Sequence, residues 1–207
     1  MEVTVAAFDV DNTLTVRDCV VPFTRRVAGT TTLLAAVVRR PLTVAKMVVK
    51  RDRDALKEFF VSVAFSQQSV EKVADISAVF ASTVVEKWMR PDVAHRLRWH
   101  QEQGHVVVLV SASLHPYLEI VGDLLEVDAV LCTRLEAQDG VYTGSLSGPN
   151  CRGAEKVARL HAWCEMANIP TSSVKNAYGD SSGDHQMLLS VENGFNVKSL
   201  ELTRVPT

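Results

Sequence analysis

Short apolar runs alternate along the chain with longer stretches in which apolar residues recur at helical spacing. Continuous apolar runs at 3–8 and 105–113 predict strands that are buried on both faces of a sheet. A third run, 174–184, is less apolar but also ends in small and acidic residues. Helices are predicted between these runs, at 91–104, 116–126 and 153–167. The alternation predicts a doubly wound α/β fold with a mostly parallel, Rossmann-like sheet.

One stretch favours antiparallel pairing instead. Between Asp128 and Gly148, two strand-like runs flank the dipeptide Asp139-Gly140. This dipeptide is typical of the two-residue turn that joins neighbouring antiparallel strands. The sequence therefore predicts one β-hairpin in an otherwise parallel fold.

Residues 18–90 differ from the rest because they contain no clear strand. Apolar residues recur at helical spacing in two parts of this stretch, 54–65 and 70–84. We therefore expect a helical cap, residues 18–90, inserted after the first strand. The catalytic core is expected to comprise residues 1–17 and 91–207.

Composition and cysteine usage are those of an ordinary globular protein. The chain has 207 residues, of which 47% are hydrophobic and 22% charged, and this length allows one good core with a smaller module. A net charge of −2 gives no reason to expect a nucleic-acid partner. The four cysteines form no CxxC motif, so reduced thiols in a cytoplasmic protein are expected.

Two observations concern membranes. The longest unbroken apolar run is LLAAVV, residues 33–38, whereas a membrane span needs about 20 residues. The apolar start of the chain runs directly into Asp9, so no signal peptide is expected. We therefore expect a cytoplasmic protein.

Polar side chains follow the predicted strands at the point where each ends. Asp9 and Asp11 follow the first strand, Ser111 ends the second, and Asp180 and Asp184 follow the third. In open α/β sheets, sites form beyond the carboxyl ends of the strands. Four carboxylates at one edge would repel each other unless a cation lay among them, and hard oxygen ligands suit Mg²⁺.

Each of these residues has an ordinary structural explanation when it is taken alone. Paired aspartates often lie in solvated turns, and Ser111 or Ser113 can cap the following helix. Lys156, at the start of the helix before the third strand, can be a surface lysine or can supply positive charge to a bound anion. The functional interpretation depends on all of them occurring in order, each at the edge where sites form.

Four segments together resemble the haloacid dehalogenase superfamily. FDVDNTLT, residues 8–15, resembles its first motif, Asp-x-Asp-x-Thr, and VLVSAS, residues 108–113, resembles its second. GAEK, residues 153–156, and YGDSSGDHQML, residues 178–188, resemble the third and fourth. The insertion resembles the helical cap of the branch that includes phosphoserine phosphatase, and the chain is similar to the subfamily IB hydrolases of that branch.

This resemblance implies an enzyme with a covalent intermediate. Asp9 would be the nucleophile and would form an aspartyl-phosphate. Asp11 would protonate the leaving alcohol and then activate water. Dehalogenases lack an aspartate at this second position and transport ATPases carry threonine there, so Asp11 implies a phosphatase or a phosphomutase. The cap favours a phosphatase.

The resemblance also assigns the remaining residues of the site. Two groups follow from it: phosphate binding by Thr13, Ser111, Ala112 and Lys156, and Mg²⁺ binding by Asp9, Asp11 (through its backbone carbonyl), Asp180 and Asp184. Within the first group, Thr13 would orient the loop, and Ser111 and Lys156 would offset charge in the transition state.

Basic residues concentrate in the cap. Residues 17–57 contain ten Lys or Arg and three acids, although the whole chain has net charge −2. The segment 39–53 combines this charge with apolar residues, so it can contact an anionic membrane surface as a peripheral protein does. The alternative, which we favour, is a basic face that attracts a small phosphometabolite. A phospholipid headgroup of the phosphatidylglycerophosphate or lysophosphatidate type remains the second substrate class.

Three other functions stay open. Phosphoserine is an alternative substrate, but Ser111-Ala112-Ser113 departs from the Ser-Gly-Gly of phosphoserine phosphatase, and Asp18 stands where that enzyme has a glutamate. A silent module that senses phosphate is a non-enzymatic alternative, although no catalytic position is substituted. A membrane-surface protein in which the basic cap does the main work is the third. The leading expectation is a Mg²⁺-dependent phosphomonoesterase.

Overall fold

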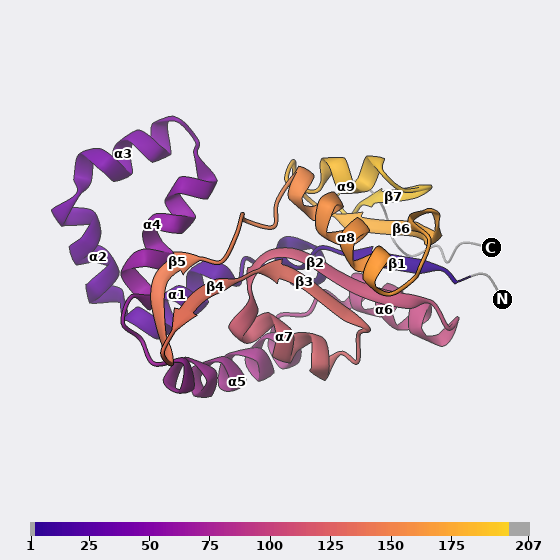
Figure 1. The fold of residues 1–207 in the computed structure, drawn as a ribbon, viewed down its shortest axis with the longest axis horizontal. Helices are drawn as coiled ribbons and strands as arrows, with labels where there is room; N and C mark the ends of the chain where they lie inside the picture. Colours follow the sequence, from indigo (N-terminus) through magenta and orange to yellow (C-terminus); the bar gives the residue numbers. More distant parts are fainter. Residues whose placement is uncertain (1–2, 199–207) are drawn as a thin grey trace.

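The computed structural model describes residues 3–198, and in them five parallel strands form one sheet (Figure 1). In sheet order these are β3 (Ala129–Thr133), β2 (Val106–Leu114), β1 (Val5–Phe8), β6 (Val174–Gly179) and β7 (Asn193–Asn196). The predicted doubly wound, parallel α/β fold is therefore confirmed. Residues 1–2 and 199–207 of the predicted core lie outside the described residues.

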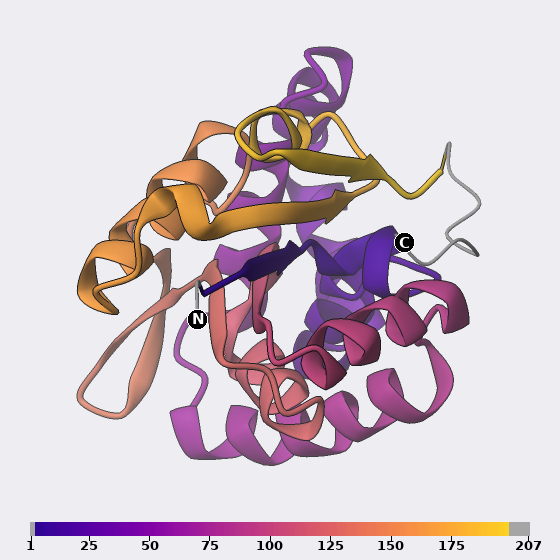
Figure 2. The same cartoon turned by 90° about the vertical axis from the view of Figure 1, so that its right-hand side faces the viewer.

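Both faces of the sheet are covered by helices (Figure 2). On one face, Val5 and Ala7 of β1 pack with α8 (Ala154–Met166) and α9 (His185–Leu189). On the other, Ala6 and Phe8 pack with three helices, α5 (Val70–Lys87), α6 (Pro91–Glu102) and α7 (His115–Leu124). Burial on both faces explains why β1 and β2 are continuous apolar runs.

The predicted hairpin is present, but it does not join the parallel sheet. It comprises β4 (Leu135–Gln138) and β5 (Val141–Leu146), which pair antiparallel around Asp139-Gly140. Both turn residues have positive φ, 51° and 78°, as a type I′ turn requires. The stretch 128–148 thus contains three strands rather than two, because β3 belongs to the main sheet.

Five helices lie between β1 and α6. They are α1 (Val20–Ala28), α2 (Thr30–Arg39), α3 (Pro41–Val49), α4 (Arg53–Phe65) and α5. The first four form a lobe at one end of the molecule's long axis, whereas α5 packs along α7 beside the sheet (Figure 1). The helices predicted at 54–65 and 70–84 are confirmed as α4 and α5. The division into core and cap at residues 17/18 and 90/91 stays a prediction.

Backbone contacts join the hairpin to this lobe. The N–H of Gln67, just after α4, donates to the Tyr142 carbonyl at 2.9 Å. Gly144 of β5 has φ +89°, and a Cβ there would lie 3.1 Å from the Ser62 carbonyl oxygen of α4. Only glycine fits this position without strain, so the hairpin lies directly against α4.

None of the helices in residues 3–198 combines the length and the apolar character that crossing a membrane requires.

A buried histidine supports the strand that leads to Asp180. His100 Nε2 lies 2.9 Å from the Tyr178 hydroxyl on β6, and His100 Nδ1 lies 2.8 Å from Nδ1 of His105. Burial is the main cause that lowers the pKa of His100 to about 3, and the charges of His105 and Arg96 contribute to this shift. His100 is therefore neutral at pH 7.

This histidine predicts a loss of stability in mild acid. Below pH about 6.5 the unfolded chain binds a proton at residue 100 that the folded chain does not, so lowering the pH favours unfolding. Between pH 7 and pH 5, His100 alone is expected to lower the free energy of unfolding by about 2 kcal/mol. Urea unfolding of His100→Gln should lack this part of the pH dependence. The exposed residue His95 offers the control: His95→Gln should keep the wild-type dependence, and equal behaviour of the two variants would contradict the prediction.

Candidate active site

The first two aspartates lie where β1 ends. The backbone N–H of Asp9 donates to the Tyr178 carbonyl at 2.9 Å, which fixes Asp9 beside β6. The chain then enters η1 (Val10–Leu14), an irregular turn in which Asn12 has φ 60°. This turn lets both Asp9 and Asp11 line the same cavity, although the two residues are only two apart.

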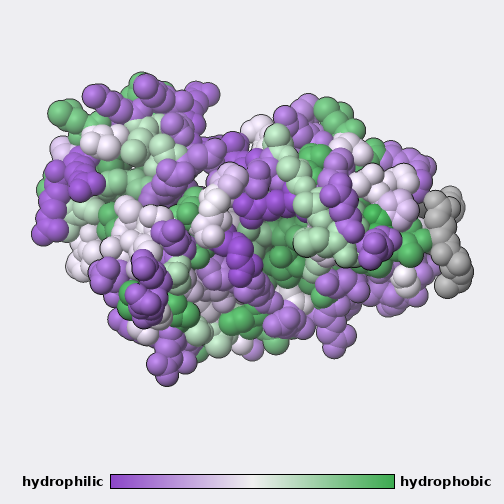
Figure 3. All heavy atoms as spheres, in the orientation of Figure 1, coloured by the Kyte–Doolittle hydropathy of each residue, from purple (hydrophilic) through white to green (hydrophobic). Residues whose placement is uncertain are grey.

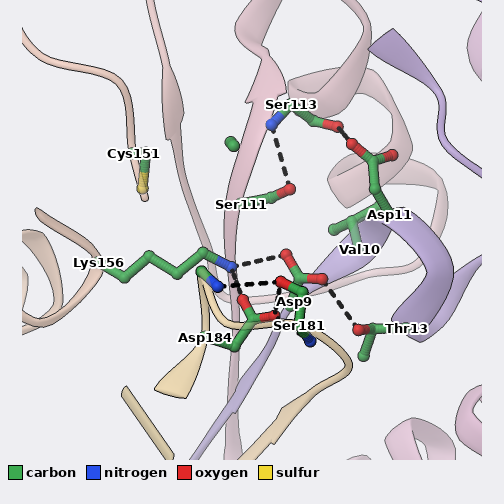
Figure 4. Close-up of polar contacts among 12 residues, drawn as sticks. Asp9, Val10, Asp11, Thr13, Ser111, Ser113, Cys151, Lys156, Ser181 and Asp184 are labelled. Atoms are coloured by element: carbon green, nitrogen blue, oxygen red, sulfur yellow. Dashed lines mark hydrogen bonds and ion pairs between the residues drawn. The ribbon is translucent and has the colours of Figure 1, made fainter. Parts of the chain in front are cut away.

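Lys156 lies between two carboxylates (Figure 4). Its ammonium is buried, 2.6 Å from Asp9 Oδ1 and 2.5 Å from Asp184 Oδ1. On the other side, the Thr13 hydroxyl donates to Asp9 Oδ2 at 2.9 Å. Because each of its two oxygens has a partner, the Asp9 carboxylate is held in one orientation.

The protonation states of Asp9, Lys156 and Asp184 depend on one another. Burial raises the pKa of Asp9, and the positive charge of Lys156 only partly opposes this. Burial alone would lower the pKa of Lys156, but Asp9 and Asp184 raise it above its ordinary value. Burial alone would raise the pKa of Asp184, yet Lys156 and hydrogen bonds from Ser181 bring it below its ordinary value. Lys156 is therefore an ammonium and Asp184 a carboxylate at neutral pH.

Three buried carboxylates have the arrangement of a cation site. Oxygen atoms of Asp9, Asp180 and Asp184 all lie within 4.8 Å of one another. Lys156 contacts two of these residues, and Lys198 contacts Asp180 Oδ2 at 2.5 Å. The donors are all hard oxygens, which Mg²⁺ prefers. The residues present therefore fit a bound Mg²⁺.

Asp11 is held apart from that group. Its Oδ1 accepts from the backbone N–H of Cys19 at 2.9 Å, and its Oδ2 accepts from the Ser113 hydroxyl at 2.8 Å. Burial raises the pKa of Asp11 to about 7, with smaller contributions from the charges of Asp18 and Asp9. A carboxyl group with this pKa can both donate and accept a proton at neutral pH.

The end of β2 contributes the next two predicted residues. Ser111 is fully buried, and its hydroxyl accepts from the Ser113 N–H at 3.1 Å. The Ala112 carbonyl accepts from the Thr133 hydroxyl at 3.0 Å and from the Lys57 ammonium of α4. Ser111 and Ala112 both line the cavity that contains Asp9.

The structure brings every predicted site residue to one edge of the sheet. Seven line the cavity: Asp9, Asp11, Ser111, Ala112, Lys156, Asp180 and Asp184. Thr13 lies behind the cavity wall, where it contacts Asp9. Their assigned roles stay predictions.

Three contacts in and around the cavity have no signal in the sequence. The sequence suggests Ser113 only as a helix cap, yet its hydroxyl donates to Asp11. Lys57 Nζ lies 2.6 Å from Asn150 Oδ1, and Asn150 donates to Asp54 at 2.5 Å. Burial lowers the pKa of Lys57 to about 8. Lys57 and Asn150 are 93 positions apart and belong to no motif, so only the fold relates them.

The cavity is lined by residues of the sheet edge and of the lobe formed by α1–α4, and it has a volume of about 780 Å³. This is within the usual range for small-molecule sites. The lobe contributes mainly apolar side chains, namely Val20, Val21, Leu33, Leu56, Phe60 and Val61. Besides Lys156, four basic residues also line the cavity: Arg53, Lys57, Arg152 and Lys198. The cavity therefore has a floor of carboxylates and basic side chains and a largely apolar wall.

The sequence matches a known protein family and a relative of similar length. Residues 6–189 match the family model of haloacid dehalogenase-like hydrolases. Protein CicA of Caulobacter vibrioides is 33% identical over 193 residues, which cover 92% of this chain and 85% of CicA.

Two solved structures share the fold. A protein of unknown function from Bordetella pertussis has a TM-score of 0.78 and 21% identity, with 93% of this chain and 88% of that chain covered. A phosphoserine phosphatase described as a phospho-aspartyl intermediate analogue has a TM-score of 0.63 and 19% identity, with coverages of 93% and 85%.

Proposed function

Because the chain belongs to the haloacid dehalogenase-like hydrolases, as its motifs predicted, we propose that it hydrolyses phosphate monoesters through an aspartyl-phosphate on Asp9. One observation carries the proposal: Asp9 and Asp11 line one cavity, and the two carboxyl groups have different surroundings. Asp9 is oriented by Lys156 and Thr13, whereas Asp11 has a pKa of about 7. The phospho-aspartyl description of the phosphoserine phosphatase with this fold supports the same chemistry.

The reaction takes place in two steps. A carboxylate oxygen of Asp9 attacks phosphorus, the bond between phosphorus and the ester oxygen breaks, and Asp11 gives its proton to the leaving alkoxide. Asp11, now a carboxylate, takes a proton from water as that water attacks the phosphorus of the aspartyl-phosphate. The bond from phosphorus to Asp9 breaks, phosphate leaves, and Asp11 is protonated again. Ser111 and Lys156 donate to the phosphoryl oxygens.

Mg²⁺ is the proposed cofactor. Asp9, Asp180 and Asp184 would hold it with the backbone carbonyl of Asp11, and the bound ion would offset the negative charge of the phosphoryl group. Lys156 and Lys198 together offset only part of the charge that three carboxylates and a phosphate bring together, which supports the need for a divalent cation.

Binding of Mg²⁺ predicts a rise in thermal stability that needs no substrate. At a Mg²⁺ concentration 100 times Kd, Tm is expected to rise by about 5–10 °C, because the ion binds the folded chain only. Asp180→Asn should remove most of this rise. Asp92→Asn, which removes a carboxylate paired with Arg90 outside the cavity, should keep it. A rise that persists in Asp180→Asn would contradict the assigned site.

The hydrogen bond between Ser113 and Asp11 predicts that replacing Ser113 lowers kcat. Ser113→Ala removes a hydrogen bond to a charged group, worth roughly 1.5–3 kcal/mol, so kcat is expected to fall about tenfold or more. Tyr117→Phe removes only the hydroxyl that donates to Ser113 at 2.7 Å and should have a smaller effect. Ser145→Ala, at an exposed serine of the hairpin, should leave kcat unchanged. If Ser113→Ala kept the wild-type kcat, the hydrogen bond from Ser113 to Asp11 would not contribute to catalysis.

The cavity favours a small phosphometabolite as substrate. Its volume suits such a molecule, and the lobe formed by α1–α4 covers the site. The apolar wall also suits an acyl or alkyl chain, which keeps a phospholipid headgroup as the second class. Phosphoserine is disfavoured because Asp18 lines the cavity where a longer glutamate would be expected, and Ala112 replaces a glycine.

Phosphate release from a panel of substrates tests the proposal. The panel should contain phosphoserine, histidinol phosphate, sugar phosphates, lysophosphatidate and phosphatidylglycerophosphate, each with Mg²⁺ and with a chelator. The proposal expects turnover of at least one compound with Mg²⁺ and none with the chelator. Phosphate binding without turnover of any compound would favour the silent sensing module.

A further inference from the structure

The two outermost helices of the α1–α4 lobe, α2 and α3, have no buried residue in the structure. On α2, Leu34 and Val38 are four positions apart and so lie on one face, and Val38 is 76% exposed. On α3, Leu42, Ala45 and Val49 have the i, i+3, i+7 spacing of a single face. Leu42 is 77% and Val49 82% exposed. Two adjoining helices thus expose apolar stripes to solvent.

Exposed basic residues lie close to these stripes in the chain. Six lie in the segment 39–53 and all are exposed: Arg39, Arg40, Lys46, Lys50, Arg51 and Arg53. None of the six forms an ion pair with any residue of the described range 3–198. The single acid of the segment, Asp52, accepts from the Ala55 N–H and caps α4. On the lobe of α2 and α3, hydrophilic and apolar residues interleave at the surface (Figure 3).

We propose that this docking face, formed by the exposed apolar residues of α2 and α3 and the six basic residues of 39–53, binds an anionic lipid surface. Contiguous exposed apolar residues with a polar rim mark interaction sites in soluble proteins. The chemistry of this rim selects the partner, because aliphatic side chains can enter the headgroup region while Lys and Arg reach anionic headgroups.

A second copy of the chain fits this face less well. Across a twofold axis the same patch meets itself, so six basic residues of one copy would approach six of the other. That contact has no compensating acids in 39–53 besides Asp52, which already caps a helix. An anionic bilayer supplies the opposite charge.

The docking face adjoins the active-site cavity. Leu33 of α2 and Arg53, the first residue of α4, both line that cavity. Docking would therefore hold the α2 side of the cavity close to the lipid headgroups. The inference does not depend on the proposed phosphatase activity, since it rests on the lobe alone.

Vesicle flotation of the full chain tests the proposal. Two vesicle compositions are compared, phosphatidylcholine alone and an equal mixture of phosphatidylcholine and phosphatidylglycerol. The wild-type chain and Asp9→Asn should both float with the mixed vesicles and should not float with phosphatidylcholine alone. Each basic residue near an anionic surface contributes about fivefold in partitioning, so binding should also weaken as salt is raised.

Two variants and two matched controls complete the experiment. The apolar variant Leu42→Ser/Val49→Ser and the charge variant Arg39→Gln/Arg40→Gln/Lys50→Gln/Arg51→Gln should each lose binding by at least about tenfold. Val79→Ser, at a residue of α5 that is 62% exposed, and Lys72→Gln/Lys87→Gln on the same helix should bind as the wild type does. Circular dichroism checks that each variant is folded.

Three results would overturn the proposal. The first is the absence of wild-type binding to mixed vesicles, and the second is full binding by both docking-face variants. The third is a wild-type dimer in sedimentation velocity that Leu42→Ser/Val49→Ser converts to a monomer, which would show that a second copy covers the face.

Discussion

Replacing Asp9 with asparagine is expected to lower kcat by at least about 10⁴-fold. The amide has nearly the same shape as the carboxylate, but it has lost the anionic oxygen that attacks phosphorus. The amide can still contact both Lys156 and Thr13. In the wild type, Lys156 Nζ lies 2.6 Å from Asp9 Oδ1 and the Thr13 hydroxyl oxygen lies 2.9 Å from Asp9 Oδ2. The loss should therefore appear in kcat and in single-turnover experiments rather than in the fold.

A matched variant and a stability measurement separate this effect from misfolding. Asp92→Asn makes the same chemical change at a carboxylate outside the cavity and should keep wild-type kcat. Thermal unfolding of Asp9→Asn should be no less cooperative than that of the wild type, because the substitution removes a charge that burial disfavours. Turnover by Asp9→Asn within tenfold of the wild type would exclude Asp9 as the nucleophile.

Replacing Asp11 with asparagine is expected to separate the two chemical steps. With p-nitrophenyl phosphate the leaving group needs no proton, so Asp9 should still be phosphorylated at a substantial rate. Breakdown of the aspartyl-phosphate needs a base, and asparagine cannot act as one. General acid–base catalysis is worth about 10²–10⁴-fold, so steady-state turnover should fall by that factor. Stopped-flow absorbance should then show a burst of one nitrophenolate per active site before the slow phase.

An alkyl phosphate provides the contrast within the same variant. Its alkoxide leaves poorly without a proton, so Asp11→Asn should show slow release of the alcohol and no burst. The pKa of about 7 for Asp11 explains why one side chain can act in both steps near neutral pH. An equal loss of both steps for p-nitrophenyl phosphate would show that Asp11 does not act as the base.

The core of the fold and the positions of the site residues were predictable because they depend on local patterns. β1 and β2 are apolar runs, and parallel strands bring their carboxyl ends to one edge. Asp9, which directly follows β1, and Ser111, in the carboxyl-terminal half of β2, must then lie near one another. The short strand β7, with the sequence NGFN, has no apolar run and was not predicted.

What could not be predicted depends on contacts between distant segments. The hairpin was predicted from its turn, but its position against α4 depends on the close approach of Gly144 to Ser62. The contact of Lys57 with Ala112 joins residues 55 positions apart. Neither contact produces periodicity or a motif, because each joins two segments that are far apart in the sequence.

Trapping the covalent intermediate shows whether Asp9 is the residue that takes the phosphoryl group. The wild-type enzyme is quenched in acid during turnover and treated with borohydride, which reduces an acyl-phosphate of aspartate to homoserine, and its peptides are sequenced by mass spectrometry. We expect homoserine at residue 9 only when substrate and Mg²⁺ are both present, and none in Asp9→Asn. Sustained turnover with residue 9 unmodified, or modification of Asp11, Asp180 or Asp184 instead, would contradict it.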